Sequence, residues 1–191
     1  MISPRIDEIT VSGAQRPENF PVASLLLARG DRAAVRAFYR FARFADDIAD
    51  SPVLPPEAKL GALDALDAAL LGETVADDAV DTAPAQELRA VLAARRLETV
   101  HARTLLCAFR RDAENRGTPT WDELMTYCRA SAAPVGRFLL DLHREPRRAL
   151  AAADALCAAL QVLNHVQDIG EDRRLRKRVD LPLDWPGGPR A

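Results

Sequence analysis

The sequence predicts an all-α protein, on three observations. Apolar residues recur at helical spacing along most of its 191 residues. No stretch alternates apolar and polar residues as a half-buried strand does, and glycines, prolines and capping residues separate the periodic segments. Because the chain is 48% hydrophobic and long enough to bury a sizeable core, we expect a single domain over residues 1–191.

The first part of the chain predicts three helices. Residues 21–29 read as a short apolar helix bounded by a proline and a glycine. Asp31 can cap a second helix, which ends near Asp50 because a Ser-Pro pair follows. The third helix runs over residues 55–71 and opens on two prolines. The acidic stretch 72–83 after it is typical of a solvated loop.

The rest of the sequence, from residue 84 onward, predicts three more helices. Residues 84–116 are periodic without interruption and stop before a glycine, which indicates one long helix. Thr120 and Glu123 have the spacing of a capping box, so a fifth helix starts there, and Pro134 should kink or break it. The sixth helix runs over residues 146–172 and passes into a basic run.

Charge and cysteine usage narrow the class of protein. The net charge of -2 predicts no general affinity for nucleic acid. The first residues lack the basic and apolar regions of a signal peptide, and no apolar run approaches the roughly 20 residues of a membrane span. Cys107, Cys128 and Cys157 are odd in number and lie in apolar segments, so we expect three buried thiols in a reducing cytoplasm.

Two acidic clusters are preceded by polar residues at the same helical spacing. Each cluster contains the spacing Asp-x-x-x-Asp. This spacing alone is weak evidence for a functional site, since the chain repeats it at residues 77–81 and 180–184. The context is more specific, because at about 100° of turn per residue each set of polar residues forms a stripe within roughly 60 to 80° of arc. The first stripe comprises Tyr39, Arg43, Asp46 and Asp50. The second comprises Gln161, Asn164, Asp168 and Asp172, together with His165.

The residue types of the second stripe indicate a function. Asn and Asp are poor helix formers, and an exposed face is more readily made from Lys and Glu. Carboxylates facing each other across a bundle would repel unless a cation lay between them, and oxygen ligands suit Mg²⁺ shared with a diphosphate. Taken alone, the first stripe is equally well a solvated edge in which Arg43 pairs with Asp46. Residues 173–178 can contact phosphate or simply complement the helix end.

Longer stretches around the stripes resemble the two signatures of the squalene/phytoene synthase family. The first is Phe-Tyr-Arg-Phe-Ala-Arg-Phe-Ala-Asp-Asp-Ile-Ala-Asp at 38–50, preceded by Asn-Phe-Pro at 19–21. The second is Leu-Gln-Val-Leu-Asn-His-Val-Gln-Asp-Ile-Gly-Glu-Asp at 160–172. The Asn-Phe-Pro opening and the Pro-Val-Gly at 134–136 are most similar to the bacterial hopanoid branch, which holds squalene and hydroxysqualene synthases.

The resemblance implies an isoprenoid-synthase helical bundle with a central cavity, and it implies roles for individual residues. Mg²⁺ is the implied cofactor, with the ligands Asp46, Asp50, Asn164, Asp168 and Asp172. Contacts to the diphosphate or substrate are implied for Asn19, Ser24, Tyr39, Arg43, Gln161 and Asn164. Tyr39 and Arg43 are the residues expected to act in catalysis.

The resemblance also implies further helices after the second signature, whereas this chain ends in a turn-rich segment at 185–191. We therefore expect a truncated domain whose C-terminal helices are missing. An uncovered apolar wall would favour self-association, so a homodimer is part of this expectation.

The implied activity is Mg²⁺-dependent ionisation and rearrangement of presqualene diphosphate to hydroxysqualene or squalene, for hopanoid and triterpene precursors. The alternative within the family is head-to-head condensation of two prenyl diphosphates. A non-catalytic helical binding module leaves the second stripe unexplained, and a di-iron bundle would need two Glu-x-x-His pairs where only Glu98 to His101 fits. The apolar product is compatible with peripheral contact with the inner membrane.

Overall fold

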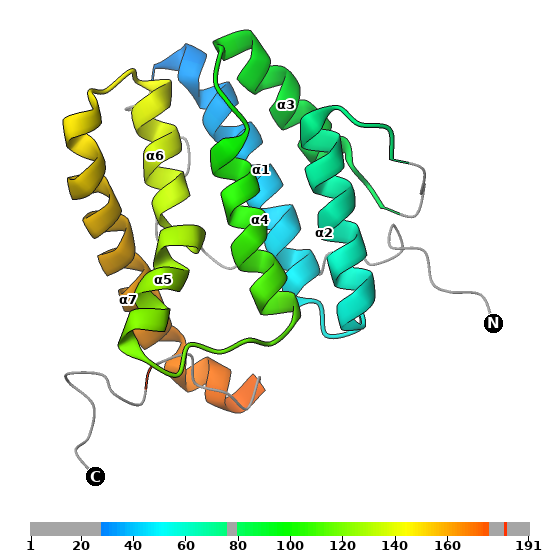
Figure 1. The fold of residues 1–191 in the computed structure, drawn as a ribbon, viewed down its shortest axis with the longest axis vertical. Coiled ribbons are helices and arrows are strands. Elements are labelled where there is room, and N and C mark those ends of the chain that lie inside the picture. Colours follow the sequence, from blue (N-terminus) through cyan, green and yellow to red (C-terminus); the bar gives the residue numbers. More distant parts are fainter. Residues whose placement is uncertain (1–27, 76–79, 176–181, 183–191) are drawn as a thin grey trace. The chain divides into compact units, whose positions relative to one another are not determined.

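The computed structural model describes residues 28–75, 80–175 and 182, with the backbone alone at 29 and 168–175. All regular elements in these ranges are helices, as the sequence predicts. Contacts divide the chain into two compact units, residues 1–113 and 114–191, and each unit is described by itself (Figure 1).

The first unit contains four helices: α1 (Arg29–Asp50), α2 (Pro56–Leu71), α3 (Ala83–Arg95) and α4 (Val100–Ala113). Helix α1 packs against each of the other three, and α2 also packs against α3 and α4. The apolar faces meet in one core whose largest fully buried side chains are Phe41, Leu63, Leu66, Leu70, Leu88, Leu92, Leu105 and Leu106. Helix α1 contributes an apolar face that includes Phe38 and Ile48, and both are buried.

In this unit the start of α1 differs from the prediction, whereas the end of α2 agrees with it. Helix α1 begins at Arg29 with Ala28 as its N-cap, so the prediction that Asp31 caps it is wrong. The Asp31 carboxylate instead accepts a hydrogen bond of 2.7 Å from Arg95 Nη1. Helix α2 ends at Leu71, as predicted, and Gly72 after it has a φ of 80°, a left-handed conformation that glycine adopts without strain.

The prediction of one helix over 84–116 is wrong, because α3 ends at Arg95 and α4 starts at Val100, with four residues between them. Arg96 adopts φ 57°, and the Leu97 amide donates to the Leu92 carbonyl at 2.9 Å, which is the bond pattern of a Schellman C-cap. Glycine usually occupies this position. An arginine there carries no signal that sequence reasoning could use.

The second unit contains α5 (Trp121–Ser131), α6 (Ala133–Leu142), the short 3-10 helix η2 (Arg147–Ala149) and α7 (Leu150–Leu175). The capping box at the start of α5 is confirmed, because the Glu123 amide donates to Thr120 Oγ1 at 3.3 Å and the Thr120 amide donates to Glu123 Oε2 at 3.1 Å. Pro134 breaks the predicted fifth helix and stands in the first turn of α6.

Helix α6 lies close against α7 because a glycine faces it. A Cβ built on Gly136 would be 2.6 Å from Cys157 Sγ. Beside this approach, Arg137 Nε and Nη2 donate to the two oxygens of Asp154, at 2.8 and 2.6 Å. The pair fixes the register of α6 along the helix that carries the second stripe.

Helix α7 also carries an exposed apolar surface. Leu156, Leu160 and Leu163 are 61%, 52% and 55% exposed, and Val166 is 36% exposed. By length and composition the segment Arg147–Gln167 is apolar enough to cross a membrane, so the prediction that no run approaches that length is wrong. The polar stripe on the same helix separates it from an ordinary membrane span.

We expect this surface to bind a hydrophobic dye strongly. Changing Leu160 and Leu163 together to glutamine should remove most of the dye fluorescence and leave the melting temperature nearly unchanged, because both side chains are exposed. The matched control changes Ala155 and Ala159, exposed alanines of the same helix, to glutamine. Equal fluorescence in the three proteins would show that the leucines are covered in solution.

Candidate diphosphate and metal site

The first stripe lies on α1, near its C-terminal end. Arg43 Nη1 donates to Asp46 Oδ2 at 3.3 Å, and Arg43 Nη2 lies 3.0 Å from Asp47 Oδ1. The pairing that the simple surface interpretation predicted is therefore present. The Asp46 side chain is nevertheless 37% exposed rather than fully solvated, while Asp50 is exposed at the end of the helix.

Electrostatics distinguish Asp46 from an ordinary surface carboxylate. Burial raises its pKa first, and the Asp50 carboxylate, followed by Asp47 and Asp112, raises it further, while Arg43 lowers it; the resulting pKa is about 7. At neutral pH this carboxyl group is therefore poised between its charged and neutral forms. A cation beside it would hold it in the charged form.

Asp112, on the last turn of α4, is a member of this cluster that sequence reasoning missed. It follows Arg110 and Arg111 near the end of a helix, and this sequence context is typical of a solvated residue. Only the packing of α4 against α1 brings its charge near Asp46. No spacing rule within one helix could have found it.

The donors on α1 fit the predicted Mg²⁺, because all are carboxylate oxygens and their mutual repulsion is what a divalent cation removes. Among the side chains that the structure describes, which leave out 168–175, no group of three or more His, Cys, Asp or Glu is placed to hold a metal ion. The side chains of Asp168 and Asp172 lie outside the described residues. That the two acidic clusters share one metal site stays a prediction.

The second stripe lies on α7, which continues unbroken as far as Leu175. Its helical spacing is therefore real through Asp172. Gln161 is half-buried and Asn164 exposed. Asn19 and Ser24, the other predicted substrate contacts, lie outside the described residues.

Tyr127 of α5 is a second residue that sequence reasoning missed. Its ring lies against His165 of the second stripe, with centroids 5.9 Å apart and planes inclined by 54°. Both side chains are half-buried. An aromatic ring therefore borders the polar stripe in the second unit.

Tyr39 lies at the other end of the first stripe, where it borders a groove of about 560 Å³ between α1 and α3. Arg36, Arg40 and Glu87 also line this groove, and Arg40 pairs with Glu87. The structure thus brings Arg43 together with Asp46, while Tyr39 faces toward α3.

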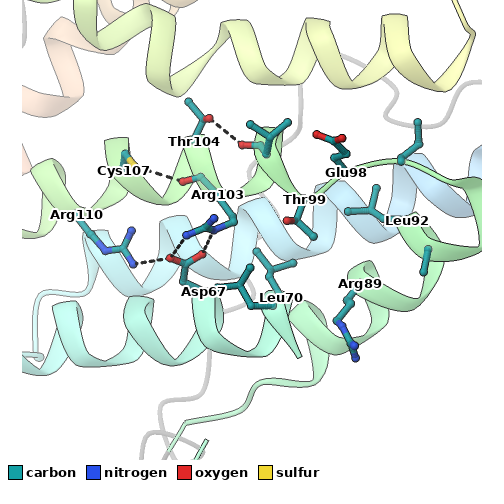
Figure 2. Close-up of a pocket in the computed structure, with 14 residues that line it drawn as sticks. Asp67, Leu70, Arg89, Leu92, Glu98, Thr99, Arg103, Thr104, Cys107 and Arg110 are labelled. Atoms are coloured by element: carbon teal, nitrogen blue, oxygen red, sulfur yellow. Dashed lines mark hydrogen bonds and ion pairs between the residues drawn. The ribbon is translucent and has the colours of Figure 1, made fainter. Parts of the chain in front are cut away.

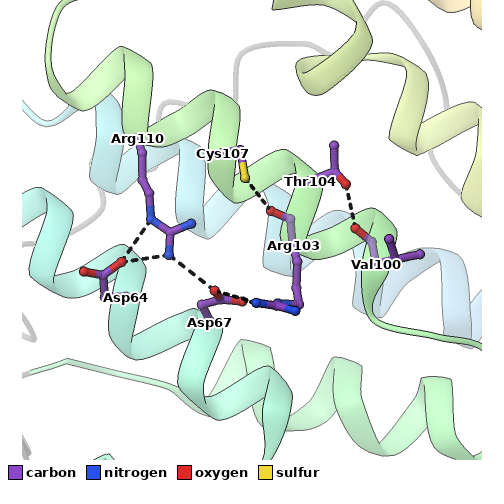
Figure 3. Close-up of polar contacts among 7 residues, drawn as sticks. All are labelled: Asp64, Asp67, Val100, Arg103, Thr104, Cys107 and Arg110. Atoms are coloured by element: carbon purple, nitrogen blue, oxygen red, sulfur yellow. Dashed lines mark hydrogen bonds and ion pairs between the residues drawn. The ribbon is translucent and has the colours of Figure 1, made fainter.

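A second groove, of about 810 Å³, lies between α2, α3 and α4 and contains none of the predicted site residues (Figure 2). Asp67 is bound there by two arginines: Arg103 Nε donates to it at 2.6 Å, and Arg110 Nη2 lies 3.5 Å from it and 2.7 Å from Asp64 (Figure 3). Because carboxylates of α2 already pair with these guanidinium groups, the network ties α2 to α4 and does not form an anion site.

The three cysteines are not all buried. Cys107 is exposed, Cys128 buried and Cys157 half-buried, so the prediction of three buried thiols is wrong for Cys107. Burial raises the pKa of Cys128 to about 11 and also raises the pKa of Cys157. Both thiols stay protonated at neutral pH.

Comparison with known proteins identifies the family. The family model for squalene/phytoene synthase matches residues 14–186. The chain is 47% identical to a hydroxysqualene synthase of Rhodopseudomonas palustris, over 93% of this chain and 59% of that protein. It is 48% identical to a hydroxysqualene synthase of Sinorhizobium fredii, over 88% and 56%. It is 35% identical to a phytoene synthase of Mycobacterium tuberculosis, over 94% and 57%.

Solved structures agree with the sequence relatives. The crystal structure of squalene synthase HpnC from Alicyclobacillus acidocaldarius superposes with a TM-score of 0.71 at 35% identity, covering 88% of this chain and 62% of that one. A dehydrosqualene synthase in complex with ligand gives a TM-score of 0.64 at 27% identity, covering 81% and 52%. The chain thus spans just over half the length of the curated relatives named above. Its helices adopt the isoprenoid-synthase fold, and the chain belongs to the squalene/phytoene synthase family.

Proposed function

We propose that this chain carries the diphosphate-binding part of a Mg²⁺-dependent enzyme that converts presqualene diphosphate to hydroxysqualene. The observation that carries the proposal is the poised carboxylate cluster around Asp46, in a chain nearly half identical to hydroxysqualene synthases. The proposed ligands are Asp46, Asp50, Asn164, Asp168 and Asp172.

The proposed reaction breaks a carbon-oxygen bond of presqualene diphosphate, so that diphosphate leaves with the electron pair. When bound, Mg²⁺ supplies stabilisation of the charge that develops on the leaving diphosphate. The carbocation rearranges, water adds to it, and loss of a proton gives the alcohol. No oxidation or reduction is involved, which agrees with the lack of a Gly-x-Gly-x-x-Gly fingerprint in the sequence.

The chain's own residues have three tasks in this proposal. Arg43, held by Asp46 and Asp47, offers guanidinium hydrogens to the diphosphate oxygens. Gln161 and Asn164 donate amide hydrogens to the same group. Tyr39 contacts the substrate beside the first stripe. Asn19 and Ser24 complete the proposed substrate contacts.

The second candidate is head-to-head condensation of two prenyl diphosphates, which the similarity to phytoene synthases favours. Both candidates use the same Asp-rich clusters, so the site alone does not separate them. In either case we propose a cytoplasmic protein whose apolar product brings it to the inner membrane surface, with a homodimer as its assembly.

Product analysis separates the candidates. With Mg²⁺ and presqualene diphosphate, we expect hydroxysqualene to form without reduced nicotinamide, and chelation of the metal to stop the reaction. Farnesyl diphosphate alone is the comparison substrate. Product that requires NADPH, or that forms from farnesyl diphosphate while presqualene diphosphate stays inert, would contradict the first candidate.

A further inference from the structure

Helix α1 ends in an electrostatically unfavourable way. Its last residues include Asp46, Asp47 and Asp50, and no basic residue lies in its last turn. The C-terminus of a helix carries partial negative charge, so carboxylates there are disfavoured by the helix as well as by one another. A helix end of this kind needs stabilisation from another element.

Lys59 of α2 places a positive charge at the C-terminal end of α1. Lys59 is only 8% exposed, and its ammonium group donates a hydrogen bond of 2.8 Å to the carbonyl of Ala49. That carbonyl is among the last four of α1, which have no partner within the helix. The cation therefore lies at the helix end, one residue from Asp50.

The position of Lys59 is costly for α2 itself. It is the fourth residue of α2, where the positive end of the helix dipole disfavours a cation, and burial of an ammonium group is unfavourable unless it is well hydrogen-bonded. A leucine or methionine would fill a buried position without either cost. The lysine is therefore explained by what it does for α1.

We propose that Lys59 is a positioning residue of the diphosphate and metal site. By holding the Ala49 carbonyl, its ammonium fixes the final turn of α1 and so the directions in which Asp46 and Asp50 present their carboxylates. This inference rests on the proposed function, because it assigns the two aspartates to the metal. Lys59 itself touches neither metal nor substrate in this role.

The other end of α1 offers a matched control. There Arg95 of α3 reaches the helix start, where its Nη1 donates to Asp31 Oδ1 at 2.7 Å and its Nη2 donates to the Gly30 carbonyl. Arg95 is thus also a cation that ties α1 to a neighbouring helix. Its contacts lie at the N-terminal end of α1, whereas the aspartates of the first stripe lie at the C-terminal end.

The test compares the wild-type chain with Lys59→Met and Arg95→Met, using Mg²⁺ alone as the probe. Melting temperature is measured against Mg²⁺ concentration, and amide hydrogen exchange is measured without metal. Both variants should melt a few degrees lower. Lys59→Met should speed exchange at residues 47–51 and raise the Mg²⁺ concentration of half-maximal response about ten- to a hundredfold. Arg95→Met should speed exchange near residue 31 and leave that concentration unchanged.

The outcomes separate this inference from the function on which it rests. A wild-type chain whose melting temperature ignores Mg²⁺ overturns the proposed function, and the role of Lys59 falls with it. A wild-type response that Lys59→Met leaves unchanged, or that both variants weaken equally, overturns the role of Lys59 alone. Should Lys59→Met fail to fold, Lys59→Gln keeps a hydrogen-bond donor without the charge and should show an intermediate Mg²⁺ response.

Discussion

In a full-length version that includes the family's C-terminal helices, Asp46→Asn is expected to lower turnover of presqualene diphosphate by about a hundredfold or more. The substitution removes one charged ligand from the proposed cation, which would stabilise the leaving group by several kcal/mol. The side-chain volume is unchanged, so the fold should persist. Asp77→Asn is the matched control: it alters the same Asp-x-x-x-Asp spacing outside either stripe. Equal losses in both variants, or turnover that survives a chelator, would remove the basis of the metal assignment.

The same substitution should make the metal-free protein more stable at neutral pH. The folded-state pKa of Asp46 is about 7, above the value of about 3.9 in an unfolded chain. The folded state therefore binds more protons between these values, and its stability rises as the pH falls through that range. Asparagine removes this penalty, so Asp46→Asn should melt above wild type at pH 7 to 8 and equally with it near pH 4. Thermal melts across this range in chelator measure the difference.

Gly136→Ala should destabilise the second unit by about 1 to 3 kcal/mol, because the added methyl group overlaps a neighbour in a packed interface. The new Cβ would lie 2.6 Å from Cys157 Sγ and 3.7 Å from Ala153 Cβ. For a chain of this size such a loss lowers the melting temperature by roughly 2 to 4 °C per kcal/mol.

Two further variants make this prediction specific. Gly61→Ala, in the middle of α2, meets no heavy atom within 4 Å, so it should instead stabilise by about 0.5 to 1 kcal/mol through helix propensity. Adding Cys157→Ala to Gly136→Ala removes the clashing sulfur and should restore most of the loss. A double variant no more stable than Gly136→Ala would show that the close approach is absent in solution.

Structural features that depend on residues within one helix were predictable from the sequence. Features that depend on packing between helices were not. The pairing of Arg43 with Asp46 and the capping box of Thr120 and Glu123 each involve residues three positions apart, and both appear in the structure. The helix end at Arg96 has no glycine or proline to mark it. Asp112 and Tyr127 join the candidate sites through neighbouring helices, which no local pattern reveals.

The two ties on α1 differ in how much chain they close. The Lys59 contact joins residues 10 apart, and the Arg95 contact joins residues 64 apart. Closing the longer loop costs about 1.6 kcal/mol more chain entropy, so the acidic end of α1 can be secured as soon as the next helix emerges during synthesis. The opposite end must wait for α3. The end of the helix that carries the proposed ligands thus has an anchor that forms over a short loop and does not need α3.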